Sequence, residues 1–358
     1  ANPYFVRMAY SPTATVLGDA VAQAPTFFSL SLIGGNDVLG YAVSGGTGTD
    51  QTGNFNPATY GSNDITDPNV FAQAFSTITT VLSSGGAKGV VTNIPNINDL
   101  PHFTTVPYNP LDPTNPAFWP QIQTLNSIFG ALNKIFDHVD HSRVIVFYET
   151  SASPVVIKDE DLADISAIIT GGLLSDLPTF EAFIGQFGLP PVAAPSVAGL
   201  LGLTYGQARQ ATEDDLLVLP SSTVIGTVNT DSVMFLMSQG LSQELAGQFS
   251  VEGVSLPLED KWVLTPEEQQ DISSAVSAFN ATISSVASAN GLALIDLNSL
   301  LQEASTTGII SGGFNTTTDL ATGGLISIDG VHLTARGYAI MANAFLEAID
   351  AAYGSNFV

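Results

Sequence analysis

Two residues suited to proton transfer, Asp329 and His332, stand three positions apart in the segment IDGVHLTARGY at residues 328–338. The chain has only four histidines, and this one directly precedes a predicted helix. A carboxylate that accepts a hydrogen bond from one ring nitrogen holds a histidine in one tautomer. The other ring nitrogen is then left to exchange a proton with a substrate. The spacing therefore predicts one half of an acid–base site.

A second polar segment, IGGND at residues 33–37, follows a predicted buried strand. At the end of a strand, Asn36 can present its side-chain N–H groups to a developing oxyanion. Parallel α/β sheets build their sites at the carboxyl ends of their strands. We therefore expect IGGND to form a turn that shares a site with Asp329 and His332.

Hydrophobic periodicity and capping residues predict the elements that position these segments. Strands are predicted at residues 26–33, 88–94 and 292–298, and helices at residues 15–23, 67–83, 121–138, 265–291 and 335–353. Thr265, Pro266 and Glu268 give the fourth of these helices a capping-box start, and Thr334 is the expected N-cap of the last. The strand–helix–strand order over residues 26–94 predicts a right-handed βαβ unit with a parallel sheet.

The composition narrows the classes of function. The 358 residues are 45% hydrophobic, which is enough for one large α/β domain. Eight Lys and Arg stand against 33 Asp and Glu, and the net charge of −25 disfavours nucleic acids and anionic lipid surfaces as partners. The lack of cysteine excludes disulfides, thiolate nucleophiles and Cys-based zinc sites. No membrane-spanning run or signal peptide is visible, and the composition fits an extracytoplasmic bacterial protein, secreted or anchored at the cell surface.

Both polar segments resemble a known family. DGVHLTARGY resembles the last conserved block of the SGNH, or GDSL-type, serine hydrolases, and IGGND resembles their Gly-x-Asn-Asp block. The resemblance covers about residues 15–100 and 262–350, and the start of the chain is also similar to surface lipoprotein-type acylhydrolases of Bacteroidota. It implies a three-layer α/β fold, with a flavodoxin-like parallel sheet flanked by helices. Residues 1–358 would form one domain with a large insertion or cap at 142–262.

The resemblance also implies a role for each polar residue. His332 would be the general base, and Asp329 would orient it and stabilise the imidazolium. Asn36 would be an oxyanion donor. The residues that shape and brace its turn would be Gly34, Gly35 and Asp37. The implied reaction is the hydrolysis of carboxylic esters, such as acyl lipids or acylated sugars, with no metal and no organic cofactor.

The nucleophile that this family requires has no counterpart in the chain. Its serine stands in a Gly-Asp/Asn-Ser turn upstream of the Asn block, whereas the similar segment LGDAVAQ at residues 17–23 has Ala20 in that place. That segment also lies too close to Gly34, because the intervening helix, strand and loop need roughly 40 residues. We therefore expect the first two strands of the sheet to be absent from this chain. An N-terminal segment of the same protein would complete the sheet beside residues 26–33 and supply the serine.

Other interpretations remain open. A remnant without its nucleophile can serve as a non-catalytic binding or structural surface module. Metal-dependent chemistry would use the clustered residues Asp137, His138, Asp140 and His141, and a calcium site would use Asp50, Asp64 and Asp67. His102 is predicted to lie in a loop, where it can border the site of Asp329 and His332, and residues 143–158 are predicted to form two short strands. The apolar residues 160–262 are expected to form a lid that favours an acyl chain.

Overall fold

The computed structural model describes residues 3–116 and 118–358, and these fall into two compact units. Unit 1 is formed by Ala1–Ser44, Gly48–His102 and Gln269–Val358, and unit 2 by Gly45–Thr47 and Phe103–Glu268. The insertion expected at residues 142–262 lies within unit 2. The second unit therefore has wider bounds than the expected insertion, and it begins earlier in the sequence.

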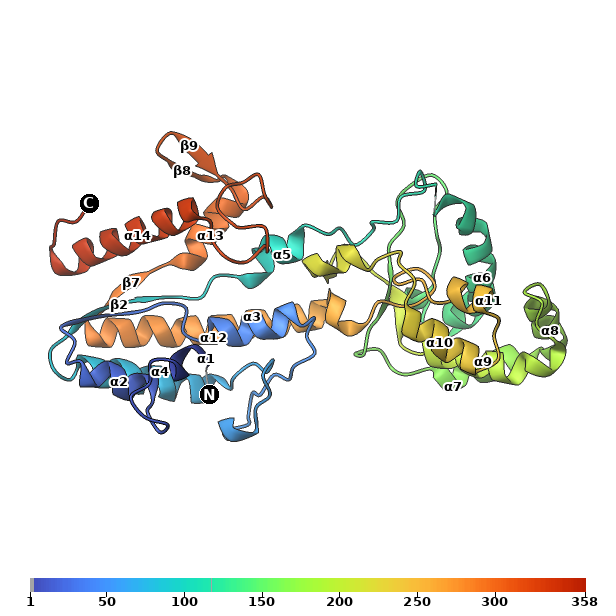
Figure 1. Cartoon of the computed structure of the whole chain (residues 1–358), viewed down its shortest axis with the longest axis horizontal. Helices are drawn as coiled ribbons and strands as arrows, with labels where there is room; N and C mark the ends of the chain where they lie inside the picture. Colours follow the sequence, from blue (N-terminus) through green and yellow to red (C-terminus); the bar gives the residue numbers. More distant parts are fainter. Residues whose placement is uncertain (1–2, 117) are drawn as a thin grey trace. The chain divides into compact units, whose positions relative to one another are not determined.

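Unit 1 is built on a small parallel sheet with the strand order β1-β2-β7 (Figure 1). These strands span Phe27–Leu30, Lys88–Thr92 and Ala293–Ile295. In the middle strand, Val90 is in register with Ala293 of β7. The three predicted strands are thus present, although each is shorter than predicted. Because they are parallel, the segments that follow them emerge at the same edge of the sheet.

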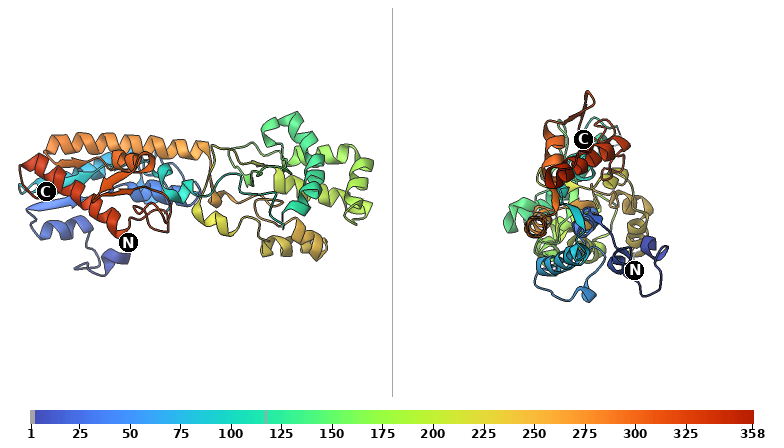
Figure 2. Two further views of the ribbon diagram at one scale, coloured as in Figure 1. Left: turned by 90° about the horizontal axis from the view of Figure 1, so that it is seen from above. Right: turned by 90° about the vertical axis from the view of Figure 1, so that its left-hand side faces the viewer.

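Helices flank this sheet on both faces, which makes unit 1 a mixed α/β structure (Figures 1 and 2). On one face lie α14 (Ala335–Tyr353) and α13 (Leu297–Thr306). On the other face lie α12 (Pro266–Asn290), α3 (Gly35–Val43) and α4 (Pro68–Ser83). The coarse prediction of a parallel sheet between helical layers therefore holds for unit 1.

Buried apolar contacts hold these layers together. Phe71 of α4 stacks on Phe279 of α12, with ring centroids 4.1 Å apart. On the opposite face, Phe345 of α14 packs against a buried cluster that includes Val90 and Ala293 of the sheet. Large buried aromatic rings contribute much of the burial energy of such a core.

Side chains at the N-termini of the long helices cap their first turns. Asp67 caps α4 by accepting hydrogen bonds from the amides of Asn69 and Val70, at 2.8 and 3.1 Å. At the start of α12, the Thr265 amide donates to the Glu268 carboxylate at 2.7 Å, and the Glu268 amide donates to the Thr265 hydroxyl at 3.4 Å. This reciprocal pair is the predicted capping box.

Strand β1 is the open edge strand that was predicted, but it is only partly buried, which corrects the prediction of a buried strand. It pairs with β2 on one side, and no strand among residues 3–116 and 118–358 pairs with its other side. Phe28 is buried, but Phe27 is 41% exposed. An unpaired edge of this kind presents backbone N–H and C=O groups to any further strand.

The remaining elements of unit 1 are short. They are α1 (Pro3–Val6), α2 (Val16–Ala22), η1 (Pro57–Thr59), η2 (Ile97–Asp99), α5 (Pro101–Thr104), β8 (Ile309–Ser311) and β9 (Phe314–Thr316). Helix α5 crosses a boundary between the units in sequence, since His102 belongs to unit 1 and Phe103 to unit 2. His102 therefore lies in a short helix and not in the predicted loop.

Unit 2 is mainly helical. Its helices are α6 (Ile122–Val139), α7 (Ser166–Ser175), α8 (Leu177–Gly185), α9 (Ala194–Tyr205), α10 (Thr230–Ser238) and α11 (Gln243–Gln248), with short turns η3 (Trp119–Gln121), η4 (His141–Arg143), η5 (Pro191–Ala193), η6 (Leu219–Thr223) and η7 (Asp260–Trp262). Its strands form two antiparallel pairs, β3 (Val156–Lys158) with β4 (Ala208–Gln210), and β5 (Leu216–Leu217) with β6 (Val263–Leu264). Of the two strands predicted within residues 143–158, only β3 is present.

A buried arginine fixes the strand pairs of unit 2. Arg209 of β4 donates from Nε to Asp159 at 2.6 Å, and from Nη1 and Nη2 to Asp215 at 2.6 and 2.8 Å. All three side chains are largely shielded from solvent. Two carboxylates and a forked guanidinium satisfy one another in a setting where an unpaired charge would be costly.

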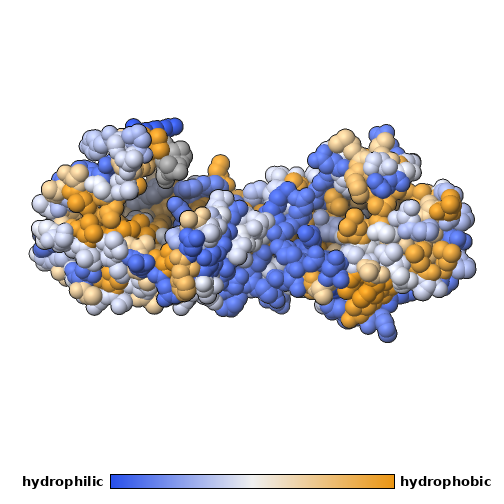
Figure 3. All heavy atoms as spheres, turned by 90° about the horizontal axis from the view of Figure 1, so that it is seen from below, coloured by the Kyte–Doolittle hydropathy of each residue, from blue (hydrophilic) through white to orange (hydrophobic). Residues whose placement is uncertain are grey.

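Apolar residues also reach the surface of unit 2. Figure 3 shows patches of them in its right-hand part, and the exposed apolar residues of α10 include Met234, Phe235 and Met237. No single helix of the described residues is long and apolar enough to cross a membrane. Helices α7 and α8 reach that length and composition only as a pair, which is bent by 95°.

Candidate active site

Asp329 and His332 lie in the loop between β9 and α14, where the chain enters its last helix. The Nδ1 atom of His332 is 2.7 Å from Oδ2 of Asp329. The backbone amides of Val331 and His332 both donate to Oδ1 of Asp329, each at 3.0 Å. The Thr334 hydroxyl then caps α14 by accepting from the Gly337 amide at 3.1 Å. The cap and the carboxylate together hold the histidine at the start of the helix.

The surroundings of Asp329 keep its carboxylate ionised. Partial burial raises its pKa, but hydrogen bonds from the Ser327 hydroxyl, the Val331 amide and His332 lower the pKa by more. The Ser327 bond is 2.6 Å long. The net effect places the pKa of Asp329 well below its ordinary value, so the group is an anion at neutral pH.

The ring of His332 is open to solvent, with 71% of its side-chain surface exposed. Because Nδ1 faces a carboxylate, a neutral ring carries its proton on Nδ1 and keeps a lone pair on Nε2. Within the described residues, no group forms a hydrogen bond to Nε2. The ring can therefore accept a proton at Nε2 while the resulting cation stays beside Asp329.

Close packing against α5 supports this loop from behind. Gly330 has φ of +75°, and a Cβ atom there would lie 2.6 Å from the backbone nitrogen of His102 and 2.8 Å from its Cα. The His102 amide donates to the Gly330 carbonyl at 3.1 Å, and its ring Nδ1 lies 3.0 Å from the carbonyl oxygen of Asp329. Position 330 thus requires glycine both for its backbone conformation and for space.

The predicted turn is present only at the start of the IGGND segment, and the rest of the segment is helical. Ile33 and Gly34 form a turn, in which the Gly35 amide donates to the Leu32 carbonyl at 2.9 Å, and helix α3 begins at Gly35. Gly34 precedes the helix with φ of +85°, Gly35 is its first residue, and Asn36 lies exposed in the first turn. A Cβ on Gly34 would come within 2.7 Å of the Phe71 ring and 3.2 Å of the Phe279 ring. The unsatisfied amides and the dipole at a helix N-terminus favour negative charge, so the helical start suits an oxyanion beside Asn36.

Asp37 contacts a different part of unit 1. Burial raises the pKa of its carboxyl, and a hydrogen bond with Thr66 offsets part of that rise. Asp37 therefore connects the first turn of α3 to the end of the polar loop at residues 44–67. Among the hydrogen bonds of the described residues, none joins Asp37 to Asp329 or His332.

An apolar groove of about 180 Å³ brings the two polar segments to one place. Its walls come from the residues that follow the three strands and from the start of α14, among them Leu32, Ile94, Leu297 and Met341. Within the part of the chain that the structure describes, Asn36 is the one polar residue of the lining, and Val331, the neighbour of His332, lines it as well. The groove therefore lies at the carboxyl edge of the sheet, where both segments were expected.

No serine among the described residues is placed as a nucleophile in this groove. None of its lining residues is serine or threonine. Ser327 directs its hydroxyl proton to Oδ1 of Asp329. Ala20, which stands in the serine position of LGDAVAQ, lies within helix α2, and Thr15 caps that helix through the Gly18 amide. The prediction that this segment is a helix, and not a nucleophile turn, is confirmed.

The other proposed metal ligands are occupied by local hydrogen bonds. His141 Nδ1 lies 2.5 Å from Asp137 Oδ1 in a pair that is exposed to solvent. Asp140 accepts from the amide and the hydroxyl of Ser142. In the polar loop, Asp64 accepts from the Thr49 and Gly61 amides, and Asp67 caps α4. Neither set forms a group of ligands around one point among the described residues.

One acidic cluster that sequence reasoning missed lies in unit 2. Glu160, Asp260 and Glu268 place carboxylate oxygens within 4.8 Å of one another. Burial and a hydrogen bond with Glu160 together raise the pKa of Asp260 to about 9. Burial outweighs the hydrogen bonds with Thr265, which lower the pKa of Glu268, and the net pKa is raised to about 8. The cluster therefore retains protons at neutral pH.

The sequence predicted Asp329, His332 and Asn36 as site residues and His102 as a possible neighbour of the site, but it did not predict their contacts with Ser327 and with the Asp329 carbonyl. Ser327 stands two residues before Asp329, a spacing at which a serine commonly bonds a neighbouring polar group, so this partner was detectable. The contact of His102 with Asp329 spans 227 residues and leaves no local signal. No family model matches this chain, and no curated protein and no solved structure is significantly similar to it.

Proposed function

We propose that this chain belongs to a serine ester hydrolase of the SGNH type, with a three-layer flavodoxin-like fold in unit 1. The observation that carries the proposal is the pairing of Asp329 with His332 at 2.7 Å, with Nε2 left without a hydrogen-bond partner in the described residues. The lining of the apolar groove includes Asn36 and the two chain neighbours of His332, Val331 and Leu333. A general base and an oxyanion donor at the carboxyl edge of a parallel sheet are the parts that acyl transfer needs.

The proposed nucleophile is a serine on a segment that pairs with the open edge of β1. Two observations support this placement. The far edge of β1 has no partner strand among the described residues, and the groove contains no hydroxyl group. A strand added beside β1 would be parallel to it in a flavodoxin-like sheet, so the turn after that strand would reach the edge that carries Asn36. The proposed source is an N-terminal segment of the same protein.

In the proposed reaction, the serine oxygen attacks the carbonyl carbon of a carboxylic ester, and its proton passes to Nε2 of His332. The carbonyl oxygen becomes an oxyanion, to which the Asn36 side chain donates. The intermediate expels the alkoxide, which takes the proton from His332 and leaves as an alcohol. A water molecule then attacks the acyl-enzyme by the same route and releases the acid and the serine. Asp329 stabilises the imidazolium in both steps.

The substrate class that the groove favours is an ester with an apolar acyl group. Nearly the whole lining is aliphatic, so an acyl chain would replace water there at a gain of about 0.8 kcal/mol per buried methylene. Acyl lipids and acylated sugars both satisfy this requirement. The chemistry requires neither a metal ion nor an organic cofactor.

The test is fluorophosphonate labelling and ester hydrolysis with the protein as its source organism produces it, followed by peptide mapping. We expect one labelled serine, and we expect His332→Ala to lower kcat by about 10⁴-fold or more. His141→Ala is the matched control, because it removes the other His–Asp pair, and it should leave the rate unchanged. If no serine is labelled and no ester is hydrolysed, the proposal is wrong.

A second function, a non-catalytic binding module derived from such a hydrolase, is favoured by one observation. The groove beside Asn36 holds no nucleophile among the described residues. The labelling experiment separates the two functions, because a binding module would show no labelled serine at any protein concentration. His332→Ala would then alter neither labelling nor hydrolysis.

A further inference from the structure

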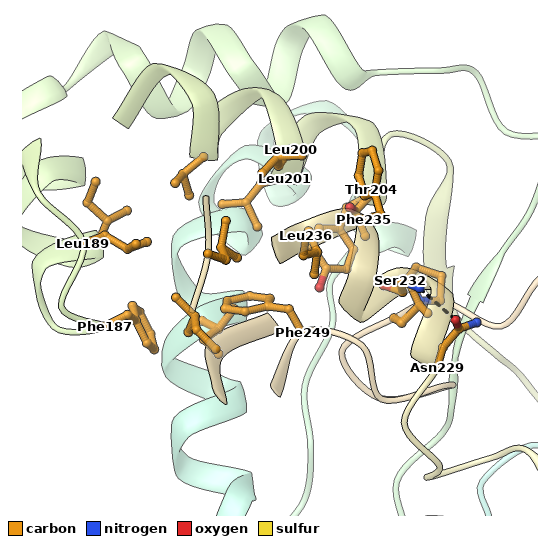
Figure 4. A pocket seen from close by; sticks show the side chains of 18 of the residues that line it. Phe187, Leu189, Leu200, Leu201, Thr204, Asn229, Ser232, Phe235, Leu236 and Phe249 are labelled. Carbon is orange, nitrogen blue, oxygen red and sulfur yellow. Dashed lines mark hydrogen bonds between the residues drawn. The ribbon is translucent and has the colours of Figure 1, made fainter. Parts of the chain in front are cut away.

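Unit 2 contains a larger cavity, of about 460 Å³, that the proposed ester hydrolysis does not use (Figure 4). It lies among helices α8, α9, α10 and α11, and all of its lining residues belong to unit 2. Its volume falls within the range of roughly 300–1,000 Å³ that is usual for small-molecule sites. The chemistry of its walls determines which class of molecule it can accept.

Most of the wall is apolar. Phe187 stands between Phe183 and Phe249, with ring centroids 5.3 and 6.2 Å away, and forms an aromatic arc with them. Leucines of α9, α10 and α11 complete the wall, among them Leu201 and Leu236. Side chains around an empty apolar space lose dispersion contacts, and water gains few hydrogen bonds there. A hydrocarbon group would restore those contacts.

The polar groups gather at one end of the cavity. In Figure 4, Phe187 and Leu189 lie at one end, and Ser232 and Asn229 lie at the other. The Ser250 hydroxyl donates to the Ser232 hydroxyl at 2.8 Å, so the Ser232 proton is left to donate to a ligand. The Thr204 hydroxyl, nearer this end, makes no hydrogen bond within the described part of the chain. Two hydroxyls are thus available to a polar head group.

The charges at the cavity are balanced. Lys158, Asp231 and Glu259 belong to the lining, and Lys261 forms an ion pair with Glu259. Lys261, outside the lining, neutralises Glu259, and Lys158 and Asp231 leave the lining with one charge of each sign. Neither an anionic nor a cationic head group therefore gains a net attraction that would offset its loss of hydration. The net charge of −25 adds a repulsion against anions. The cavity is therefore suited to a head group that is polar but uncharged.

We propose that the unit 2 cavity is a binding site for an uncharged amphiphile. Its hydrocarbon chain lies along the aromatic arc, and its hydroxyl or ester head bonds to Ser232 and Thr204. The proposal does not depend on ester hydrolysis in unit 1, because it concerns binding to residues of unit 2 alone. Both hydroxyls can donate and accept, so a neutral alcohol and a neutral ester are equally acceptable as heads.

The test is calorimetric titration of the full chain with 1-hexanol, 1-octanol and 1-decanol. We expect saturable binding that tightens roughly fourfold per added methylene, the factor that 0.8 kcal/mol per CH₂ implies. Octanoate and octylammonium have the same chain with charged heads, and we expect each to bind more weakly than 1-octanol. Equal or tighter binding of either ion would overturn the assignment of an uncharged head.

Two variants on one helix locate the site. Leu200 of α9 lines the cavity, so Leu200→Trp should fill it and lower the affinity for 1-octanol by at least tenfold. Leu203 lies on the same helix but is 69% exposed and outside the lining, so Leu203→Trp is the matched control and should bind normally. If both variants bind alike, the site is elsewhere and the proposal is wrong.

A milder variant keeps the test valid if Leu200→Trp does not fold. Thr204→Val removes one hydroxyl and nearly preserves the volume of the side chain. It should weaken 1-octanol binding by about 2- to 10-fold, the range for one hydrogen bond. The absence of saturable binding to the unmodified chain would overturn the proposal, whatever the result of labelling at unit 1.

Discussion

Replacement of Gly330 by alanine tests whether the loop that carries His332 is held by packing against α5. An alanine with φ of +75° costs about 1–2 kcal/mol relative to glycine. The new Cβ would also lie 2.6 and 2.8 Å from the backbone N and Cα of His102, which no side-chain rotation can relieve. Overpacking of this kind adds about 1–3 kcal/mol. We therefore expect Gly330→Ala to lower the free energy of unfolding of unit 1 by about 2–5 kcal/mol.

Gly312→Ala is the matched control for this experiment. Gly312 has φ of +58° in the turn between β8 and β9, and a Cβ there would meet no atom within 4 Å. Its substitution should cost only the conformational part, about 1–2 kcal/mol. The measurement is amide hydrogen exchange in α14 and β7, which reports unit 1 separately from unit 2. If Gly330→Ala costs no more than Gly312→Ala, the packing argument is wrong.

The Gly330 variant has a second readout at the histidine itself. A displaced loop would lengthen the bond between His332 Nδ1 and the Asp329 carboxylate, now 2.7 Å. Nitrogen NMR of the ring should then show less of the Nδ1–H tautomer in Gly330→Ala than in the unmodified chain. An unchanged tautomer ratio would show that the carboxylate contact does not depend on the position of α5.

Three further predictions concern stability. Asp215→Asn should destabilise unit 2 by about 3 kcal/mol in urea denaturation, because it leaves the buried Arg209 with one carboxylate in place of two. Asp67→Ala should lower the free energy of unfolding by about 1–2 kcal/mol through loss of the α4 cap. A decrease of less than about 0.5 kcal/mol would contradict that role. Folding raises the pKa of Glu268 to about 8, so the stability of unit 2 should be highest at acid pH and fall as the pH rises through 8. Glu268→Gln keeps the capping box and should flatten this fall, whereas the exposed Glu267→Gln should not.

Local sequence signals predicted the helices of unit 1 better than its strands. The start of α4 at Pro68 and of α14 at Ala335 follow from Asp67 and Thr334, whose side chains bond amides in the first turn. Strands have no such local cap, and their ends depend on where the partner strand ends. Strand β1 is short and half exposed because its far edge has no partner among the described strands. A hydrophobic run alone cannot report that difference.

The sequence predicted the contact between Asp329 and His332 in the candidate site, but not the backbone conformation at Gly34 and Asn36. The three-residue spacing of Asp329 and His332 is local, so their contact follows from the sequence. The start of α3 at Gly35 does not follow from the sequence, because the need for glycine at position 34 comes from distant residues. A Cβ there would lie within 2.7 Å of the Phe71 ring and 3.2 Å of the Phe279 ring. A Gly-Gly pair is compatible with a turn or with a helix start, and only the packing decides.

Unit 2 was the least predictable part, because its polar clusters join residues far apart in sequence. Glu160 and Asp260 are far apart in the sequence, and no motif links them. The cavity depends in the same way on the approach of α9 to α10 and α11, which are separate short helices. Apolar composition indicated a lid-like segment, but composition does not determine which faces of those helices meet.

The pKa values of Asp329 and of the acidic cluster in unit 2 are shifted in opposite directions. The direction of the shift determines which carboxylate can assist a base. Asp329 receives donors from a hydroxyl, two amides and a ring, which outweigh its partial burial and hold its pKa low. Asp260 and Glu268 are more buried and face a third carboxylate, so burial and repulsion raise their pKa. At neutral pH only the first kind carries a full charge, and only a charged carboxylate stabilises an adjacent imidazolium. The contribution of Asp329 to stability should therefore persist at neutral pH and be lost only as the pH falls below the ordinary carboxyl range, whereas the contribution of the unit 2 cluster should be lost as the pH rises.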